Sequence, residues 1–188
     1  MKEFIRNKID CLKARRLFRR SKAHLGHFPR FFRGIQYMTI ENGVSVGYFA
    51  RIENYDSYAG EKYSPNLIIG KGTLIMNNFT CLNAGTIKIG CYCMIASNVF
   101  ISSENHGMNP ENGTYISQPL LVKDVLIGNN VWLGEKVMIM PGVQLGDNVI
   151  VGGGSIVTNS FPDNVIIAGN PAKIIKIWNE KERKWIAP

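Results

Sequence analysis

Aliphatic residues recur at every sixth position through much of the second half of the chain. One phase of this repeat holds Ile127, Leu133, Ile139, Leu145, Val151 and Val157. The positions four places later hold Val131, Val137, Val143, Val149, Ser155 and Phe161. A period of six matches neither the 3.6 residues of a helical turn nor the alternation of one long strand. The pattern therefore predicts short strands joined by sharp corners.

Glycine and asparagine occupy the expected corners of this repeat. They are Gly128, Gly134, Gly146, Gly152, Asn129 and Asn148. Both residue types tolerate the positive φ that tight turns often require, so their placement supports the division into strands and corners.

The same period occurs earlier, in two runs whose phases differ by two residues. The first run holds Ile69, Ile75, Cys81 and Ile87, and the second holds Ile89, Ile95 and Ile101. The spacing of 26 residues from Ile101 to Ile127 is not a multiple of six, so we expect a loop to leave the repeat near residues 103–121. Repeat proteins often carry insertions on the binding face, so functional residues are expected in this loop.

A single six-residue unit buries too little apolar surface to be stable alone. Stacked as parallel strands about 4.8 Å apart, successive units would align their aliphatic positions into one continuous core. The backbone groups of each unit would then hydrogen-bond to the units above and below. The pattern predicts an all-β coil of parallel strands.

Four segments of this coil carry recognisable sequence signatures. They are residues 127–134 (IGNNVWLG), 141–147 (PGVQLGD), 153–158 (GGSIVT) and 168–173 (AGNPAK). In order and spacing they resemble the hexapeptide-repeat acyltransferases, and the resemblance covers residues 67–176. It implies a left-handed parallel β-helix of triangular section, which we expect over residues 34–173. The handedness comes from the resemblance alone.

The two ends of the chain differ from the repeat. Residues 1–33 contain 11 Lys and Arg against 2 Asp and Glu, whereas residues 34–188 contain 11 against 12. Helical spacing of Phe4, Ile5, Ile9 and Leu12 predicts that residues 1–33 form a basic, helical N-terminal extension. This helix would pack on its own subunit or contact anionic lipid, and nucleic acid is the weaker choice because no recognised binding module accompanies the charge.

The C-terminal residues 174–188 are expected to form a short amphipathic helix that caps the last turn of the coil. The prediction rests on Ile174, Ile175, Trp178 and Trp185, which are interspersed with charged residues. An uncovered end of a parallel coil exposes unpaired backbone groups and invites association, so each end needs a cap.

Composition narrows the compartment and the chemistry. No apolar run approaches the roughly 20 residues of a membrane span, and no signal-peptide pattern begins the chain. Four cysteines give no disulfide framework, and Cys81 and Cys93 fall at inward repeat positions. We therefore expect a cytoplasmic protein that contains no metal. Peripheral contact of its basic extension with the inner membrane face is the alternative to a fully dissolved protein.

Of three histidines, two lie in the basic extension and His106 lies in the excursion loop, within SSENHGMN. A lone loop histidine usually has no catalytic role. The resemblance, however, implies that His106 is catalytic. The NHGM sequence around it, with Tyr115 following, is similar to the corresponding segment in one branch of the family, which includes the galactoside, maltose and streptogramin acetyltransferases. A neutral imidazole can take the proton of an acceptor hydroxyl that attacks a thioester. Direct transfer from acetyl-CoA then needs no covalent enzyme intermediate.

The resemblance also implies the residues that bind the coenzyme. Acetyl-CoA is expected to contact Trp132, Gly134, Glu135, Gly153, Thr158, Asn159, Lys173 and Lys176. Backbone N–H groups near residues 132–135 are candidates for an oxyanion site. Three six-residue sides make a turn of about 18 residues, which would stack Asn83 beneath Ile101 at the root of the loop, so the acceptor is expected to meet Asn83, Asn77 and Glu104. Glu104 or a backbone carbonyl could instead orient His106, and both asparagines could equally be turn residues.

The expected function is transfer of an acetyl group to a hydroxyl of a sugar or a surface-polysaccharide precursor. A coil with flat faces offers no deep cleft, so we expect a homotrimer with the site at the subunit boundary. An antibiotic O-acetyltransferase and a noncatalytic scaffold stay open as alternatives. A carbonic-anhydrase-like zinc protein would need several coil histidines, and the coil offers only His106.

Overall fold

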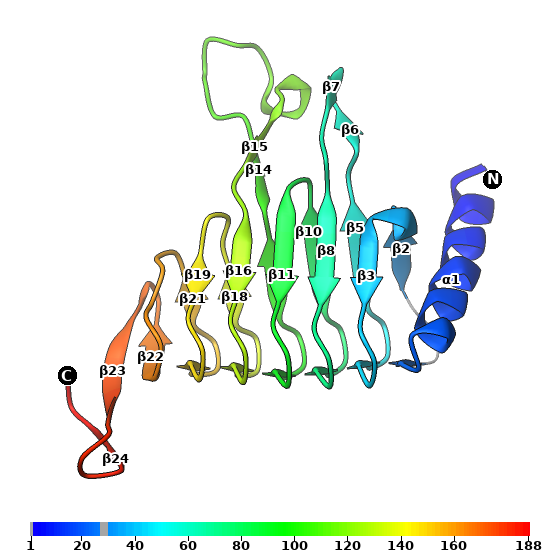
Figure 1. Cartoon of the computed structure of the whole chain (residues 1–188). Coiled ribbons are helices and arrows are strands. Elements are labelled where there is room, and N and C mark those ends of the chain that lie inside the picture. Colours follow the sequence, from blue (N-terminus) through cyan, green and yellow to red (C-terminus); the bar gives the residue numbers. More distant parts are fainter. Residues whose placement is uncertain (1, 27–29) are drawn as a thin grey trace.

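The computed structural model describes residues 2–26 and 30–188, and the side chains of residues 7–26 and 30–188. Figure 1 shows a coil of short parallel strands with one helix across its N-terminal end and two hairpins that protrude from one side. His27 lies outside the described residues.

Three parallel sheets form the faces of the coil, and each full turn contributes one strand to each face. Sheet A contains β1 (His24–Leu25), β4 (Ser45–Val46), β9 (Leu74–Ile75), β12 (Met94–Ile95), β17 (Trp132–Leu133), β20 (Ile150–Val151) and β22 (Val165–Gly169). Sheet B contains β2 (Phe31–Arg33), β5 (Arg51–Asn54), β10 (Thr80–Asn83), β13 (Phe100–Ser102), β18 (Met138–Ile139) and β21 (Ile156–Val157). Sheet C contains β3 (Met38–Ile40), β8 (Asn66–Ile69), β11 (Thr86–Ile89), β16 (Val125–Ile127) and β19 (Gln144–Leu145).

The six-residue phases predicted from the sequence are the inward positions of these strands. Leu133 pairs with Val151 and Ile139 pairs with Val157, so one turn takes 18 residues in this part of the coil. The phase shift of two residues falls within β11, where Ile87 and Ile89 both point inward and are buried. The aliphatic residues at these positions belong to one continuous core, which extends from Ala14 of the N-terminal helix to Ala172.

The corners confirm the positive φ expected at Asn148 but not at Asn129, where the neighbouring Asn130 adopts it instead, and not at the predicted glycines. Asn148 adopts a positive φ of 58°. Gly128 and Gly146 are absent from the positive-φ positions, and their role is close stacking of successive turns. A Cβ on Gly128 would lie 2.6 Å from the backbone carbonyl carbon of Gly146, so a side chain would force the two turns apart.

The N-terminal helix α1 (Lys2–Arg20) covers the first turn of the coil, with Ala14 and Phe18 completely buried against it. The Asn7 side chain ties the helix to the coil by accepting a hydrogen bond from the Phe32 N–H. The coil begins earlier than residue 34, because β1 and β2 already pair with β4 and β5.

The predicted C-terminal helix is wrong. Residues 172–188 form β23 (Ala172–Asn179) and β24 (Lys184–Ile186), which extend sheet A as antiparallel strands. β-branched isoleucines favour a strand, and the exposed edge of β22 offers a partner for it. The rings of Trp178 and Trp185 then pair across the hairpin, 5.3 Å apart.

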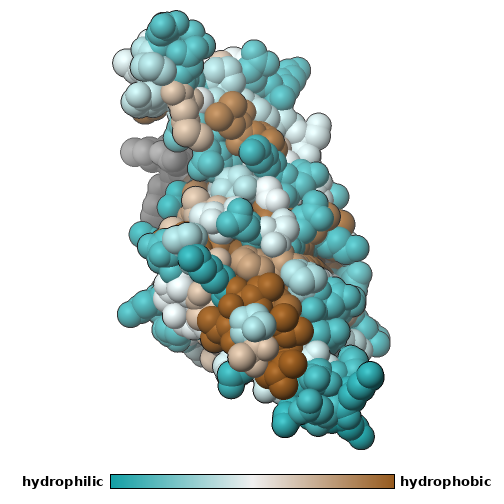
Figure 2. Space-filling model, turned by 90° about the vertical axis from the view of Figure 1, so that its left-hand side faces the viewer, coloured by the Kyte–Doolittle hydropathy of each residue, from teal (hydrophilic) through white to brown (hydrophobic). Residues whose placement is uncertain are grey.

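The C-terminal end of the coil keeps exposed hydrophobic surface. Figure 2 looks onto this end and shows hydrophobic residues gathered over its lower half. Ile175 and Ile177 of β23 are 47% and 38% exposed.

Two excursions leave the coil at the corner where sheet B passes into sheet C. The first is the hairpin β6 (Ser57–Tyr58) and β7 (Glu61–Lys62), which the sequence analysis did not predict. The second is the hairpin β14 (Glu104–His106) and β15 (Leu120–Val122), which confirms the excursion expected near residues 103–121. Short 3-10 turns, η1 (Ile35–Tyr37) and η2 (Tyr115–Ser117), lie in the same region. Both hairpins rise on the same side of the coil (Figure 1).

Candidate active site

His106 is the last residue of β14 and is exposed at the base of the excursion loop. Its backbone pairs with Leu120 on β15. A hollow of about 590 Å³ opens beside it, lined by Asn105, His106, Gly107, Met108 and Tyr115. The predicted base is therefore accessible and stands beside a space that a substrate can enter.

The buried side chain of Gln118 closes the loop beyond His106. Its Nε2 donates to the Asn109 carbonyl at 2.8 Å, and its Oε1 accepts from the Asn109 N–H at 3.1 Å. A Cβ on Gly107 would lie 2.6 Å from Gln118 Oε1, so this position requires glycine. The residue after His106 is thus fixed by packing, which limits the directions the backbone can take.

Tyr58 of the first hairpin and Tyr63, which directly follows this hairpin, contact the second excursion. The Tyr58 ring lies 5.1 Å from the His106 ring at an interplanar angle of 66°, an edge-to-face contact. The Tyr58 hydroxyl donates to the Ile116 carbonyl at 2.7 Å, and the Tyr63 hydroxyl accepts from the Leu120 N–H at 2.8 Å. The sequence analysis did not identify either tyrosine. The available signal was the tyrosine-rich stretch before Leu67, which does not fit the six-residue repeat.

Glu104 lies two residues before His106 and therefore on the same side of β14. Burial raises the pKa of Glu104; the nearby His106 opposes this rise, and the Glu53 carboxylate adds to it. Glu53 is itself buried, accepts a hydrogen bond from the Tyr55 hydroxyl at 2.9 Å and forms an ion pair with Arg51. The geometry keeps open the prediction that Glu104 helps to orient His106 or to bind the acceptor.

Asn83 is completely buried and forms part of a polar ladder beneath the excursion loop. Its Nδ2 donates to Asn54 Oδ1 at 2.9 Å, and its Oδ1 accepts from the Ser103 hydroxyl at 2.8 Å. The expected stacking on Ile101 is wrong by two residues, because Ile101 pairs with Cys81. Both polar ends of Asn83 are used inside the coil, so its contact in this structure is structural.

Asn77 lies at a different corner of the coil from His106. It follows β9, where sheet A passes into sheet B, and its Oδ1 accepts from the Tyr48 N–H at 2.8 Å. Within one chain the predicted acceptor residues Asn77 and Glu104 are therefore not brought together.

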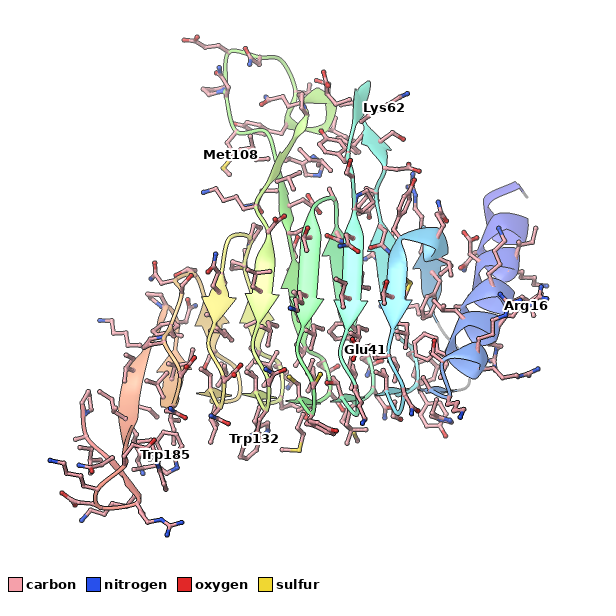
Figure 3. The ribbon with its side chains drawn as sticks, viewed as in Figure 1. Arg16, Glu41, Lys62, Met108, Trp132 and Trp185 are labelled. Carbon is pink, nitrogen blue, oxygen red and sulfur yellow. The ribbon has the colours of Figure 1, made fainter. Side chains whose placement is uncertain are left out.

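Several predicted coenzyme residues gather at the corner between sheets A and B. Trp132 is 45% exposed, and the Gly154 N–H donates to the Glu135 carbonyl at 2.7 Å. A Cβ on Gly134 would lie 2.6 Å from the Gly153 nitrogen, so the turns are closely stacked here. Trp132 and Met108 lie on opposite sides of the coil (Figure 3). The structure does not bring this corner to His106 within one chain.

The remaining predicted coenzyme residues are exposed at two other places. Thr158 and Asn159 follow β21, at the end of sheet B, and Lys173 and Lys176 lie on β23. Of the proposed oxyanion donors, the N–H groups of Trp132 and Gly134 already donate to the next turn, as sheet hydrogen bonds.

Two of the four cysteines lie in the core of the coil. Cys81 and Cys93 are buried, as the repeat predicted, and burial raises the pKa of the Cys81 thiol to about 12. Among the described residues, no group of three or more histidine, cysteine or carboxylate side chains could hold a metal ion. No helix in the described part of the chain is long and apolar enough to cross a membrane.

Comparisons with known proteins agree with this architecture. Residues 124–159 match the family model described as bacterial transferase hexapeptide (six repeats). The putative lipopolysaccharide biosynthesis O-acetyl transferase WbbJ of Escherichia coli is 32% identical, over 97% of this chain and 92% of that protein. The chain belongs to the hexapeptide-repeat transferase family.

Two further relatives of this hexapeptide-repeat protein are acetyltransferases. The galactoside O-acetyltransferase of Escherichia coli is 39% identical over 65% of this chain, which spans 60% of that relative's length. A solved galactoside acetyltransferase in complex with coenzyme A has a TM-score of 0.66 at 30% identity, covering 82% of this chain and 72% of that one. These likenesses support the left-handed β-helix that the sequence resemblance implied.

Proposed function

We propose that this protein transfers an acetyl group from acetyl-CoA to a hydroxyl of a sugar or of a surface-polysaccharide precursor. The main support for this proposal is the position of His106. Its imidazole is exposed beside a hollow of about 590 Å³, on an excursion from an otherwise regular coil. The similarity to a galactoside O-acetyltransferase and to a putative lipopolysaccharide O-acetyl transferase supports a carbohydrate acceptor.

In the proposed reaction His106 acts as a general base. The acceptor oxygen attacks the thioester carbonyl carbon while its proton passes to the imidazole, and the carbon–sulfur bond then breaks. The imidazolium returns the proton to the coenzyme thiolate, so the enzyme ends in its starting state. General-base catalysis of this kind contributes typically about 10²- to 10⁴-fold. The deeply buried Cys81 cannot serve as a nucleophile, because burial raises the pKa of its thiol to about 12.

The acetyl-CoA site is proposed to form between neighbouring subunits of a trimer. In sheet A, Leu74, Met94 and Trp132 align in register and are 41%, 43% and 45% exposed. An apolar row on a flat sheet face is typical of a surface that another subunit covers. Packing against this row would bring the Trp132 corner of one subunit to the His106 hairpin of the next, with Lys173 and Lys176 available for coenzyme phosphates.

The exposed face of α1 is the proposed site of peripheral contact with the cytoplasmic face of an anionic membrane. Ile9 and Leu12 are 46% and 67% exposed, and Lys13, Arg16, Arg19 and Arg20 are exposed beside them. Arg16 points away from the coil (Figure 3). Each basic residue near an anionic surface contributes about 1 kcal/mol, and such contact would keep the enzyme near lipid-linked glycans.

Sedimentation with vesicles tests this contact. The full-length protein should bind phosphatidylglycerol vesicles, weaken as salt rises, and fail to bind phosphatidylcholine vesicles. Arg16→Glu with Arg19→Glu should abolish binding, whereas the equal charge change Lys62→Glu with Lys181→Glu should not. Equal loss in both double variants would refute a role for α1.

The acetyl acceptor is identified with labelled acetyl-CoA. We expect label to pass to mono- or oligosaccharides in a panel that also contains streptogramin and chloramphenicol antibiotics. Transfer to an antibiotic alone would replace the proposed function with the alternative one. The absence of transfer to any acceptor, together with no binding of acetyl-CoA by calorimetry, would favour a noncatalytic scaffold.

A further inference from the structure

The base of the His106 hairpin is braced by the first hairpin, which is not part of the repeat. Tyr58 presents its ring to the His106 imidazole at 5.1 Å and 66°. This is the tilted geometry that aromatic pairs prefer, because the positive edge of one ring faces the negative face of the other. The contact constrains both the position and the plane of the imidazole.

The same side chain also reaches the 3-10 turn η2 within the excursion loop. The Tyr58 hydroxyl donates to the carbonyl of Ile116 in η2, next to Tyr115, which lines the hollow. Tyr63, the residue directly after β7, accepts a hydrogen bond from the N–H of Leu120, the residue that pairs with His106. Tyr58 and Tyr63 thus contact His106, its cross-strand partner Leu120 and the turn that carries Tyr115 at the wall of the hollow.

An exposed imidazole on a loop would otherwise rotate freely about its side-chain torsions. A general base must lie within hydrogen-bond reach of the proton that it abstracts, and small misplacement is costly to rate. We propose that Tyr58 is a positioning residue for His106, holding the imidazole plane while its hydroxyl locks the loop in the same orientation. This inference rests on the proposed role of His106 as general base.

Two substitutions separate the ring from the hydroxyl. Tyr58→Leu removes the ring and should lower kcat about 10- to 100-fold with KM for acetyl-CoA changed less than about twofold. Tyr58→Phe keeps the ring and should retain kcat within about threefold, because the edge-to-face contact persists. Tyr92→Leu is the matched control, since Tyr92 is exposed at another corner and packs on Gly72. Tyr58→Met provides a second ring-free variant if Tyr58→Leu does not fold.

A double-mutant cycle distinguishes positioning from simple loop stability. If Tyr58 acts through His106, Tyr58→Leu should cause no further loss in the residual activity of His106→Ala. An equal fold loss in both backgrounds would overturn the proposal. Unchanged activity of His106→Ala alone would instead overturn the proposed function, so the two failures are distinguishable.

Nuclear magnetic resonance of the histidine rings gives a readout independent of activity. The chain has three histidines, so His106 is assigned by its loss in His106→Ala. Tyr58→Leu should shift and broaden the His106 ring signals, Tyr58→Phe should preserve them, and the signals of His24 and His27 should not move. His106 signals that are identical in Tyr58→Leu and the unchanged protein would refute the contact and the positioning role together.

Discussion

At the scale of single residues, the buried polar groups under the excursion loop are fully paired. The Ser103 hydroxyl donates to Asn83 and accepts from the N–H groups of Ala84 and Gly85 at 3.1 and 3.2 Å. Asn54 continues the ladder to the Gly34 carbonyl at 3.2 Å. Such networks stabilise a structure when every member is satisfied and become costly when one partner is removed.

Asn83→Ala should therefore lower the free energy of unfolding by about 2–4 kcal/mol, because it leaves Asn54 Oδ1 without its donor and the Ser103 hydroxyl hydrogen without its acceptor in the core. Urea unfolding followed by circular dichroism measures this loss. Asn66→Ala, at an exposed position of β8, is the control and should change little. A midpoint for Asn83→Ala equal to that of the unchanged protein would contradict the structural role assigned to the ladder.

Glu104 should make stability depend on pH. Burial raises the pKa of Glu104, so the folded state binds its proton at pH values where the unfolded chain, with a pKa of about 4.3, has already lost it. Stability then falls as pH rises from the unfolded pKa through the folded pKa. Glu104→Gln removes this pH-dependent loss of stability. The Tm of the variant should therefore exceed that of the unchanged protein by more at pH 7.5 than at pH 4.

Thermal unfolding at the two pH values checks this sign. Glu111→Gln, an exposed carboxylate in the same loop, serves as the control. The interpretation of Glu104 would have to be dropped if its substitution changed Tm equally at both pH values, or as little as the control does.

At the scale of elements, the regular coil, the N-terminal helix and the excursion near residues 103–121 could be predicted, whereas the C-terminal strands and the first hairpin could not. Inward positions such as Leu133 and Val151 repeat because strand spacing and corner geometry impose a period. The helix predicted for the C-terminal segment was wrong because Ile174, Ile175 and Trp178 fit a helical spacing in the sequence. In the structure this segment instead forms a strand that pairs with the free edge of β22. The hairpin at β6 and β7 has only two-residue strands, too short for periodicity to detect.

Truncation after Lys173 should cause aggregation, because it removes nearly all of β23 and β24 and leaves the edge of β22 unpaired. It should also weaken acetyl-CoA binding through loss of Lys176. Light scattering over time and calorimetric titration measure the two effects. Trp185→Ala keeps the strands but removes the Trp178 contact, and we expect it to show an intermediate degree of aggregation. A truncated protein as soluble and as active as the full chain would exclude a capping role.

At the scale of the whole molecule, the parts expected to act together lie on different faces of one chain. His106 ends β14 at the corner between sheets B and C, whereas Trp132 lies on sheet A and Gly153 follows β20 of the same sheet. The topology of the coil causes this separation. The six-residue repeat predicts where a residue lies along the coil, but it does not predict which residues meet across a subunit boundary. A site that uses both groups requires a neighbouring subunit.

The protein should accordingly be a trimer, with a light-scattering mass three times that of the 21.0 kDa chain. Trp132→Glu should dissociate it and abolish transfer, because the apolar row on sheet A would carry a charge. Leu126→Glu, a partly exposed residue on sheet C, is the control for a charge on another face. A fully active monomer at working concentration would contradict the intersubunit site.

The central claim is that His106 takes the proton of the acceptor hydroxyl. The most direct measurement is kcat for acetyl transfer by His106→Ala, compared with His24→Ala on the exposed first strand of sheet A. We expect His106→Ala to fold and bind acetyl-CoA normally while kcat falls at least about 100-fold, and His24→Ala to retain full activity. Retention by His106→Ala of more than about a tenth of kcat would contradict the account.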